Sequence, residues 1–192
     1  MRNLPILFCL IGMAVAAAEP KVPRISPEYA IRLTTGQQLL LSQYRGKVVG
    51  LLFVQTTCPH CQQTCQLMER LSREYGPRGF QALAVAFNPM AAMLVPDFIK
   101  QNGLTFPVGY DARDPVFEYL SWSPAIRTYV PILVFVDRNG VIRGQYMGDD
   151  KFFLPGEQEK NMRVMIEQLL KEPVSNRRAL PAYRRSAPKK TS

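Results

Sequence analysis

Hydrophobic residues along the middle of the chain follow two different patterns, one typical of buried strands and one typical of a helix. Residues 47–55 (KVVGLLFVQ) and 80–87 (FQALAVAF) are nearly continuous apolar runs rich in β-forming residues, which predicts two strands buried on both faces of a sheet. Residues 59–75 instead place apolar side chains at every third or fourth position and charged ones between them, which predicts an amphipathic helix. Gly76 and Pro77 are expected to end that helix.

Weaker patterns predict the remaining elements: hairpins at 29–41 and 131–147, an extended segment at 106–110, and helices at 91–101, 114–122 and 160–170. Pro96 lies inside the first of these helices, and Pro115 is expected at the first position of the second. Strands and helices that alternate in this way, followed by a hairpin and a helix, predict an α/β fold. Its central mixed β-sheet should have helices on both faces and an N-terminal β-hairpin.

The two ends of the chain differ in composition from its body. Residues 1–18 hold Arg2, an apolar stretch and three consecutive alanines, which predicts a secretory signal peptide cleaved near Ala18. An uncleaved N-terminal anchor is the alternative. The prolines of residues 19–28 predict an irregular linker, and residues 173–192 predict a basic disordered tail. One domain at 29–172 is long enough to bury a core, and the expected location is periplasmic or secreted.

Charge is distributed unevenly along the 192 residues, whose net charge is +9. Residues 173–192 carry six basic side chains and no acidic one, whereas residues 19–172 carry 17 basic and 15 acidic ones. The body is therefore nearly neutral, and an exported, nearly neutral domain is not expected to bind nucleic acid. Weak contact of the tail with an anionic membrane surface is the expected role of its charge. We expect the protein to be a monomer.

The residues best suited to chemistry lie at 57–61, between the first buried strand and the first helix. Pro59 suits the first position of a helix, so Cys58 is expected at or beside the N-cap. A thiol there faces unpaired N–H groups and the positive end of the helix dipole, both of which stabilise the thiolate. His60 adds an imidazole in the same turn. Cα atoms three residues apart in such a turn lie about 5 to 6 Å apart, so Cys58 and Cys61 can form a disulfide without unfolding.

Other interpretations of the cysteines stay open. A zinc site would need a second CxxC or an HxxxH, which the chain lacks, and a purely structural disulfide over so short a loop would be strained. Cys65 lies one turn beyond Cys61 and is expected to be a buried small hydrophobe, or else a third redox or metal-binding thiol. Cys58, Cys61 and Cys65 together offer soft ligands for Cu(I), so a Cu(I)-binding metallochaperone is an alternative function. The leading interpretation needs no cofactor.

Residues 29–170 resemble the thioredoxin superfamily, and specifically its exported TlpA-like and AhpC/TSA (redoxin) members. The resemblance rests on LSQYRGK after the front hairpin, the apolar strand that leads into the CxxC, Pro131 at a later strand and the hairpin VFVDRNGVIRG. It implies a thioredoxin-like three-layer sandwich and a thiol-disulfide oxidoreductase, in which Cys58 attacks and Cys61 resolves. Its implied partners are protein thiols or disulfides and a redox-partner protein. It further implies that Pro131 is cis and that Val130 touches the substrate.

The dipeptide Pro59-His60 within the CxxC is similar to that of the strongly oxidising DsbA enzymes. Whatever stabilises the Cys58 thiolate favours the reduced form, and this raises the reduction potential toward about −120 mV in the most oxidising members. The direction of electron flow stays open, because reductases of the same superfamily have lower potentials.

The chain also departs from its relatives. Leu52 stands where thioredoxin and DsbA carry a buried acid, and the neutral Gln63 and Thr64 stand where some exported reductases have a glutamate. The PxxxTxxC pattern of peroxiredoxins is absent at both Cys58 and Cys65. Its absence disfavours a thiol peroxidase, which is the enzymatic alternative.

Overall fold

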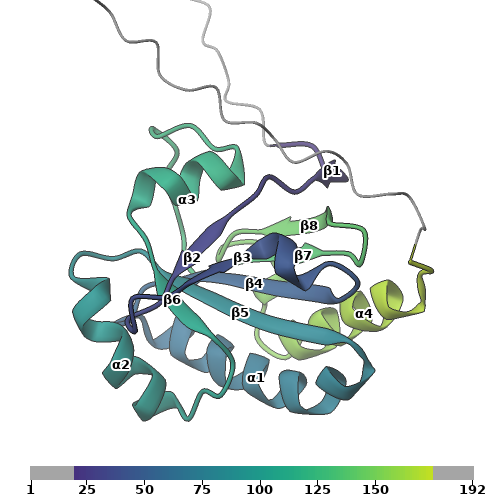
Figure 1. Cartoon of the computed structure of the whole chain (residues 1–192), viewed down its shortest axis with the longest axis horizontal. Helices are drawn as coiled ribbons and strands as arrows, with labels where there is room; N and C mark the ends of the chain where they lie inside the picture. Colours follow the sequence, from purple (N-terminus) through teal and green to yellow (C-terminus); the bar gives the residue numbers. More distant parts are fainter. Residues whose placement is uncertain (1–19, 175–192) are drawn as a thin grey trace, which may run out of the picture.

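The computed structural model describes residues 20–174, whose strands form one eight-stranded mixed sheet (Figure 1). The strand order is β1-β8-β7-β4-β5-β6-β2-β3. The strands are β1 (Arg24–Ile25), β2 (Ala30–Arg32), β3 (Gln38–Leu40), β4 (Val48–Val54), β5 (Phe80–Ala86), β6 (Val108–Tyr110), β7 (Ile132–Val136) and β8 (Val141–Tyr146). The α-helices are α1 (Pro59–Tyr75), α2 (Ala91–Asn102), α3 (Arg113–Leu120) and α4 (Gln158–Lys171).

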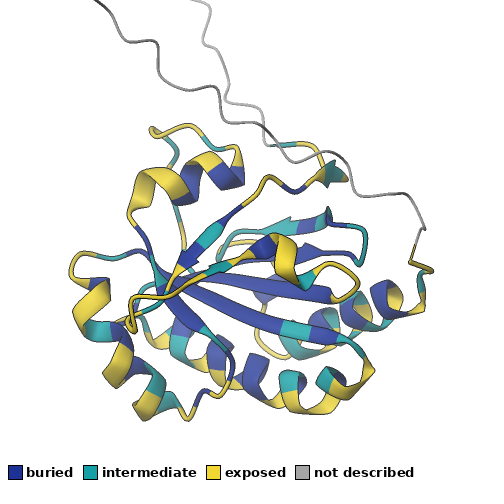
Figure 2. Cartoon of the chain, viewed as in Figure 1, coloured by how far each residue is buried: buried dark blue, intermediate teal, exposed yellow. Residues whose placement is uncertain are grey.

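The centre of the sheet consists of the strands predicted from the apolar runs. β4 pairs in parallel with β5, from Val48 opposite Phe80 to Val54 opposite Ala86, and pairs antiparallel with β7 on its other side. Every residue of β4 and β7 is buried (Figure 2). Strands covered on both faces need apolar side chains at successive positions, which explains why their sequences do not alternate.

Helices cover both faces of the sheet and create two separate cores. Buried side chains of α1, α2 and α4 pack in one core, and those of α3 pack in the other with residues of β2. In Figure 1, α1, α2 and α4 lie below the sheet and α3 lies above it. This arrangement confirms the predicted three-layer α/β sandwich and its N-terminal hairpin, formed by β2 and β3.

Local differences from the predictions are small. Pro115 occupies the third position of α3 rather than the first, where its missing N–H is still one of those without an intrahelical partner. Pro96 lies inside α2, which runs without interruption from Ala91 to Asn102. α1 begins and ends where predicted, because Cys58 is its N-cap and the chain passes at Gly76 into a short 3₁₀ turn.

The chain ends bear on the predicted linker, signal peptide and tail. The expectation of irregular structure throughout 19–28 was wrong, because β1 pairs with β8 at Arg24 and Ile25. An isolated pair of residues carries no periodic signal, so only the neighbouring strand makes it a strand. The signal peptide predicted at 1–18 and all but two residues of the predicted tail lie outside the described residues. Within residues 20–174, no helix is both long enough and apolar enough to cross a membrane.

Candidate active site

Cys58 occupies the N-cap of α1, as predicted. Its backbone is extended, Pro59 follows at the first helical position, and the Cys58 Sγ accepts a hydrogen bond from the Cys61 backbone N–H at 3.3 Å. The Cys58 N–H itself donates to the Gln55 carbonyl oxygen at 3.1 Å. Cys58 is half-buried, whereas the other two described cysteines are buried. A negative charge on this atom meets a hydrogen-bond donor and the positive end of the helix together.

The second and third cysteines are enclosed in the core below the sheet. Cys61 and Cys65 are fully buried and both belong to the core formed with α2 and α4. Burial raises the pKa of the Cys61 thiol well above its ordinary value, although a backbone hydrogen bond with Gln55 acts in the opposite direction. Burial raises the pKa of Cys65 to about 12. Cys58 is thus the accessible thiol, and Cys61 can be reached only from inside the site.

A pair of reciprocal hydrogen bonds holds the loop in front of the CxxC. The Thr56 N–H donates to Asn88 Oδ1 at 2.9 Å, and Asn88 Nδ2 lies 3.1 Å from Thr56 Oγ1. Gln62 Nε2 donates to the Thr56 carbonyl oxygen at 3.0 Å. Sequence reasoning missed Asn88. Its signal is topological, since it follows β5, which lies beside β4 in the sheet.

His60 lies half-buried against an aromatic group that sequence reasoning also missed. Its ring meets the Phe153 ring edge to face, with centroids 5.7 Å apart and planes at 84°. Phe153 belongs to a short 3₁₀ turn (Lys151–Phe153), and its neighbour Phe152 stacks on Tyr146 at 4.0 Å. A segment 93 residues further along the chain therefore packs against the imidazole.

Val130 and Pro131 precede β7, and the peptide bond between them is cis, as the resemblance implied. Ile132 is opposite Phe53 in the β4–β7 pairing, so Pro131 lies level with the end of β4, where the CxxC loop begins. Gly148 packs against this segment, and its N–H donates to the Tyr129 carbonyl oxygen at 3.0 Å.

The positions at which the chain departs from its relatives are filled without a carboxylate. Leu52 is fully buried between Ala84 of β5 and Leu133 of β7. Thr64 is also buried, and its Oγ1 accepts a hydrogen bond from Gln158 Nε2 at 2.8 Å. Gln63 is exposed. The chain thus places apolar and neutral groups where an acid could otherwise receive the proton of the second cysteine.

The Cu(I) alternative depends on Cys58, Cys61 and Cys65 acting together. In the part of the chain that the structure describes, no group of three or more His, Cys, Asp or Glu side chains is placed to hold a metal ion. Cys61 and Cys65 lie inside the core, where packed side chains surround the sulfurs. The described residues therefore give that alternative no support.

Known proteins resemble this chain in sequence and in structure. It is 30% identical over 118 residues to the thiol-disulfide oxidoreductase ResA of Geobacillus kaustophilus, which covers 62% of this chain and 64% of the relative. The ResA of Bacillus subtilis is 28% identical over 133 residues, covering 66% of this chain and 74% of the relative. The chain thus spans slightly less than two thirds of the first of these relatives.

A solved structure supports the fold. The thiol:disulfide interchange protein of Chlorobium tepidum TLS, a thioredoxin family protein, superposes with a TM-score of 0.64 at 19% identity, covering 80% of this chain and 99% of that one. At that identity the likeness concerns the fold alone. Residues 22–145, more than half of the chain, match the AhpC/TSA family. The sheet is thioredoxin-like, a thiol lies at the start of α1, and the family match covers most of the strands. The chain therefore belongs to the AhpC/TSA family.

Proposed function

We propose that the protein is an exported thiol-disulfide oxidoreductase that exchanges disulfides with protein substrates through Cys58 and Cys61. The observation that carries the proposal is the contrast between the two sulfurs. Cys58 is half-buried at a helix N-terminus and accepts a hydrogen bond from the Cys61 N–H, whereas the Cys61 thiol is fully buried. Relatives named thiol-disulfide oxidoreductase support the same activity.

The exchange needs only these two thiols and a substrate disulfide. The Cys58 thiolate attacks one substrate sulfur, the substrate S–S bond breaks, and the other substrate sulfur leaves as a thiol after taking up a proton. Cys61 then loses its proton and attacks Cys58 Sγ, which releases the remaining substrate thiol and leaves the Cys58–Cys61 disulfide. Because burial disfavours the Cys61 thiolate, the mixed disulfide should persist until Cys61 is deprotonated. The same steps in reverse oxidise a substrate dithiol.

His60 and the segment before β7 have supporting roles in this proposal. His60, which contacts Phe153, lies in the same first turn of α1 as Cys58 and is assigned the role of stabilising its thiolate. The segment at Val130 and Pro131 offers extended backbone to the substrate, level with the beginning of the CxxC loop. Export rests on the signal-peptide pattern of residues 1–18.

Two variants of the same helix test the proposal. Cys61→Ala should accumulate a stable mixed disulfide between Cys58 and a substrate protein, detected by mass spectrometry as an adduct that dithiothreitol removes. Cys65→Ala is the matched control: it changes the same residue type one turn further along α1 and should accumulate no adduct. Turnover that survives Cys58→Ala would contradict the proposal.

A measurement of the reduction potential settles the direction. Equilibration of the Cys58–Cys61 couple with glutathione should give a value at the oxidising end of the range, toward about −120 mV, if Pro59 and His60 act as in DsbA enzymes. A value near about −270 mV or below would assign a reductase instead. Consumption of peroxide by the reduced protein would favour the thiol peroxidase alternative.

A further inference from the structure

A trench with a volume of about 860 Å³ lies beside the CxxC loop, at the carboxyl ends of β4, β5 and β6. Gln55, which follows β4, and Thr128, which precedes the cis proline by three residues, both line it. It therefore ends close to both parts of the site described above. Crevices at the carboxyl ends of parallel strands are common ligand sites in α/β sheets. Neither the two thiols nor His60 lines the trench.

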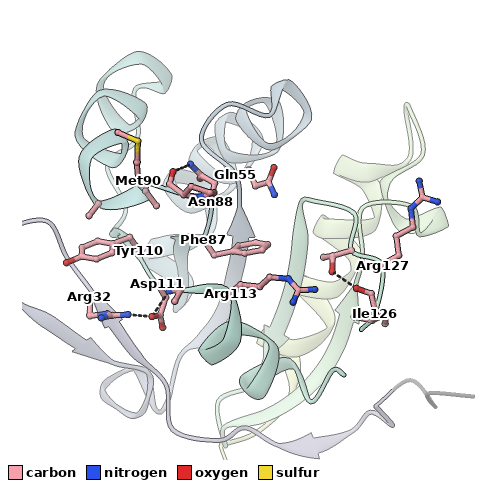
Figure 3. A pocket seen from close by; sticks show the side chains of 15 residues that line it. Arg32, Gln55, Phe87, Asn88, Met90, Tyr110, Asp111, Arg113, Ile126 and Arg127 are labelled. Carbon is pink, nitrogen blue, oxygen red and sulfur yellow. Dashed lines mark hydrogen bonds and ion pairs between the residues drawn. The ribbon is translucent and has the colours of Figure 1, made fainter. Parts of the chain in front are cut away.

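Part of the lining of the trench is apolar. Phe87, Met90 and Tyr110 contribute to its lining, and the Met90 side chain is exposed although it is large and hydrophobic. In Figure 3, Phe87 lies between the segment that carries Asn88 and Met90 and the segment that carries Ile126 and Arg127. A cleft of this kind can bury apolar side chains of a bound segment.

The charge of the trench is positive. Its lining holds three arginines and one acid. The acid, Asp111, is buried and already bonded to Arg32, to the Tyr29 hydroxyl at 2.9 Å and to the Ala112 N–H at 2.8 Å. It does not neutralise the other two arginines.

Arg113 and Arg127 have no carboxylate partner among residues 20–174. The Arg113 guanidinium lies 3.9 Å from the centroid of the Phe117 ring and donates to the Pro124 carbonyl oxygen at 2.9 Å, which leaves its remaining N–H groups available. Arg127 lies 5.1 Å from the centroid of the Tyr129 ring. Guanidinium groups that rest on aromatic rings are held in place and suit paired hydrogen bonds to a carboxylate.

We infer that this trench binds an acidic segment of the disulfide-bearing substrate protein, with carboxylates on Arg113 and Arg127 and an apolar side chain against Phe87 and Met90. The inference rests on the proposed function, because the trench would hold chain that flanks the substrate cysteine while that cysteine is at Cys58. The two unpaired guanidinium groups select carboxylates over amides and amines. The trench, and not the two thiols, thus determines which substrate proteins are preferred.

Two peptides test the inference. Each has one cysteine linked by a disulfide to 2-thiopyridine; the first carries Asp and Glu on both sides of the cysteine, and the second carries Asn and Gln at the same positions. Attack of Cys58 on the peptide sulfur breaks the S–S bond and releases thiopyridone, whose absorbance is followed. At low salt the reduced full chain should react about tenfold faster with the acidic peptide, and the advantage should disappear at high salt.

The double variant Arg113→Gln and Arg127→Gln should lose this preference and react with the acidic and amide peptides at equal rates. Arg70→Gln is the matched control, because Arg70 is an exposed arginine of α1 outside the trench, and it should keep the preference. Arg127→Glu alone should abolish the preference for the acidic peptide, because it places a carboxylate in the trench with Arg113, and this single variant covers the case in which the double variant does not fold.

Serine versions of the peptides separate binding from exchange. In fluorescence anisotropy, the acidic serine peptide should bind the wild-type chain about tenfold more tightly than its amide counterpart. Equal binding and equal reaction rates of acidic and amide peptides would overturn the trench inference and leave the proposed function intact. No reaction with either disulfide peptide, combined with selective binding of the acidic serine peptide, would overturn the proposed function instead.

Discussion

A substitution of Gly148 tests the proposal that the segment before β7 presents backbone to the substrate. Gly148 lies against that segment so closely that a Cβ atom built on it would be 2.6 Å from the Val130 carbonyl oxygen and 2.7 Å from the Val130 carbonyl carbon. Carbon–oxygen contacts between backbones ordinarily begin at about 3.3 Å, so Gly148→Ala must displace Val130 by about 0.7 Å. The obstacle is backbone and cannot rotate away.

Gly148→Ala should therefore slow disulfide exchange with a protein substrate by about tenfold or more, since a misplacement of about 1 Å at a reacting site costs roughly a hundredfold. The rate is followed by the turbidity of reduced insulin or by stopped-flow fluorescence. Alkylation of reduced Cys58 by iodoacetamide, which needs no substrate backbone, should stay within about twofold of wild type.

Gly76→Ala is the matched control. A Cβ on Gly76 would meet no atom within 4 Å outside its two neighbours in the chain, and Gly76 lies at the far end of α1 from the CxxC. Gly76→Ala should therefore leave exchange unchanged. It should lower the free energy of unfolding, because a residue that precedes a proline, here Pro77, is disfavoured in the α conformation once it carries a Cβ. Wild-type exchange by Gly148→Ala would refute the reasoning, because either the displacement or the role of Val130 would then be wrong.

Three other predictions concern stability and reactivity. Glu69 is buried, and burial raises its pKa. Hydrogen bonds from the Thr105 N–H and hydroxyl outweigh that effect and leave the pKa lowered. Glu69→Gln should therefore lower the free energy of unfolding, measured in urea at pH 7, by about 1.5–3 kcal/mol. A lowered pKa stabilises the fold above the unfolded pKa, and this stabilisation declines as pH falls below it, so a cost that is the same at pH 7 and at pH 3 would contradict this assignment. Cys65 should be alkylated only after unfolding, because burial raises its pKa to about 12, and modification of the folded protein at pH 8 would show otherwise. Gly109→Ala would place a Cβ 2.5 Å from the Arg32 carbonyl oxygen and should cost about 1–3 kcal/mol; an unchanged urea midpoint would rule out that close approach.

Much of the site could be predicted because its determinants are local. An apolar run followed by Cys58 and Pro59 defines a strand, an N-cap and a first helical residue within a dozen positions, and each of these depends on near neighbours in the chain. The spacing of Cys58 and Cys61 follows from helical geometry alone. The buried position of Cys65 likewise follows from the helical period.

Tertiary structure decided what distant segments add to that local unit. Asn88 accepts a hydrogen bond from Thr56, and the Phe153 ring contacts His60. Gly148 closely approaches the backbone of Val130. Each of these contacts joins residues more than fifteen positions apart in the chain. No periodicity encodes such contacts, because they arise only when strand order and register bring the ends of separate strands to one edge of the sheet. For the same reason the trench, with its arginines from α3 and from the segment before β7, has no signature in the linear pattern: its charge exists as a surface only after the sheet has assembled.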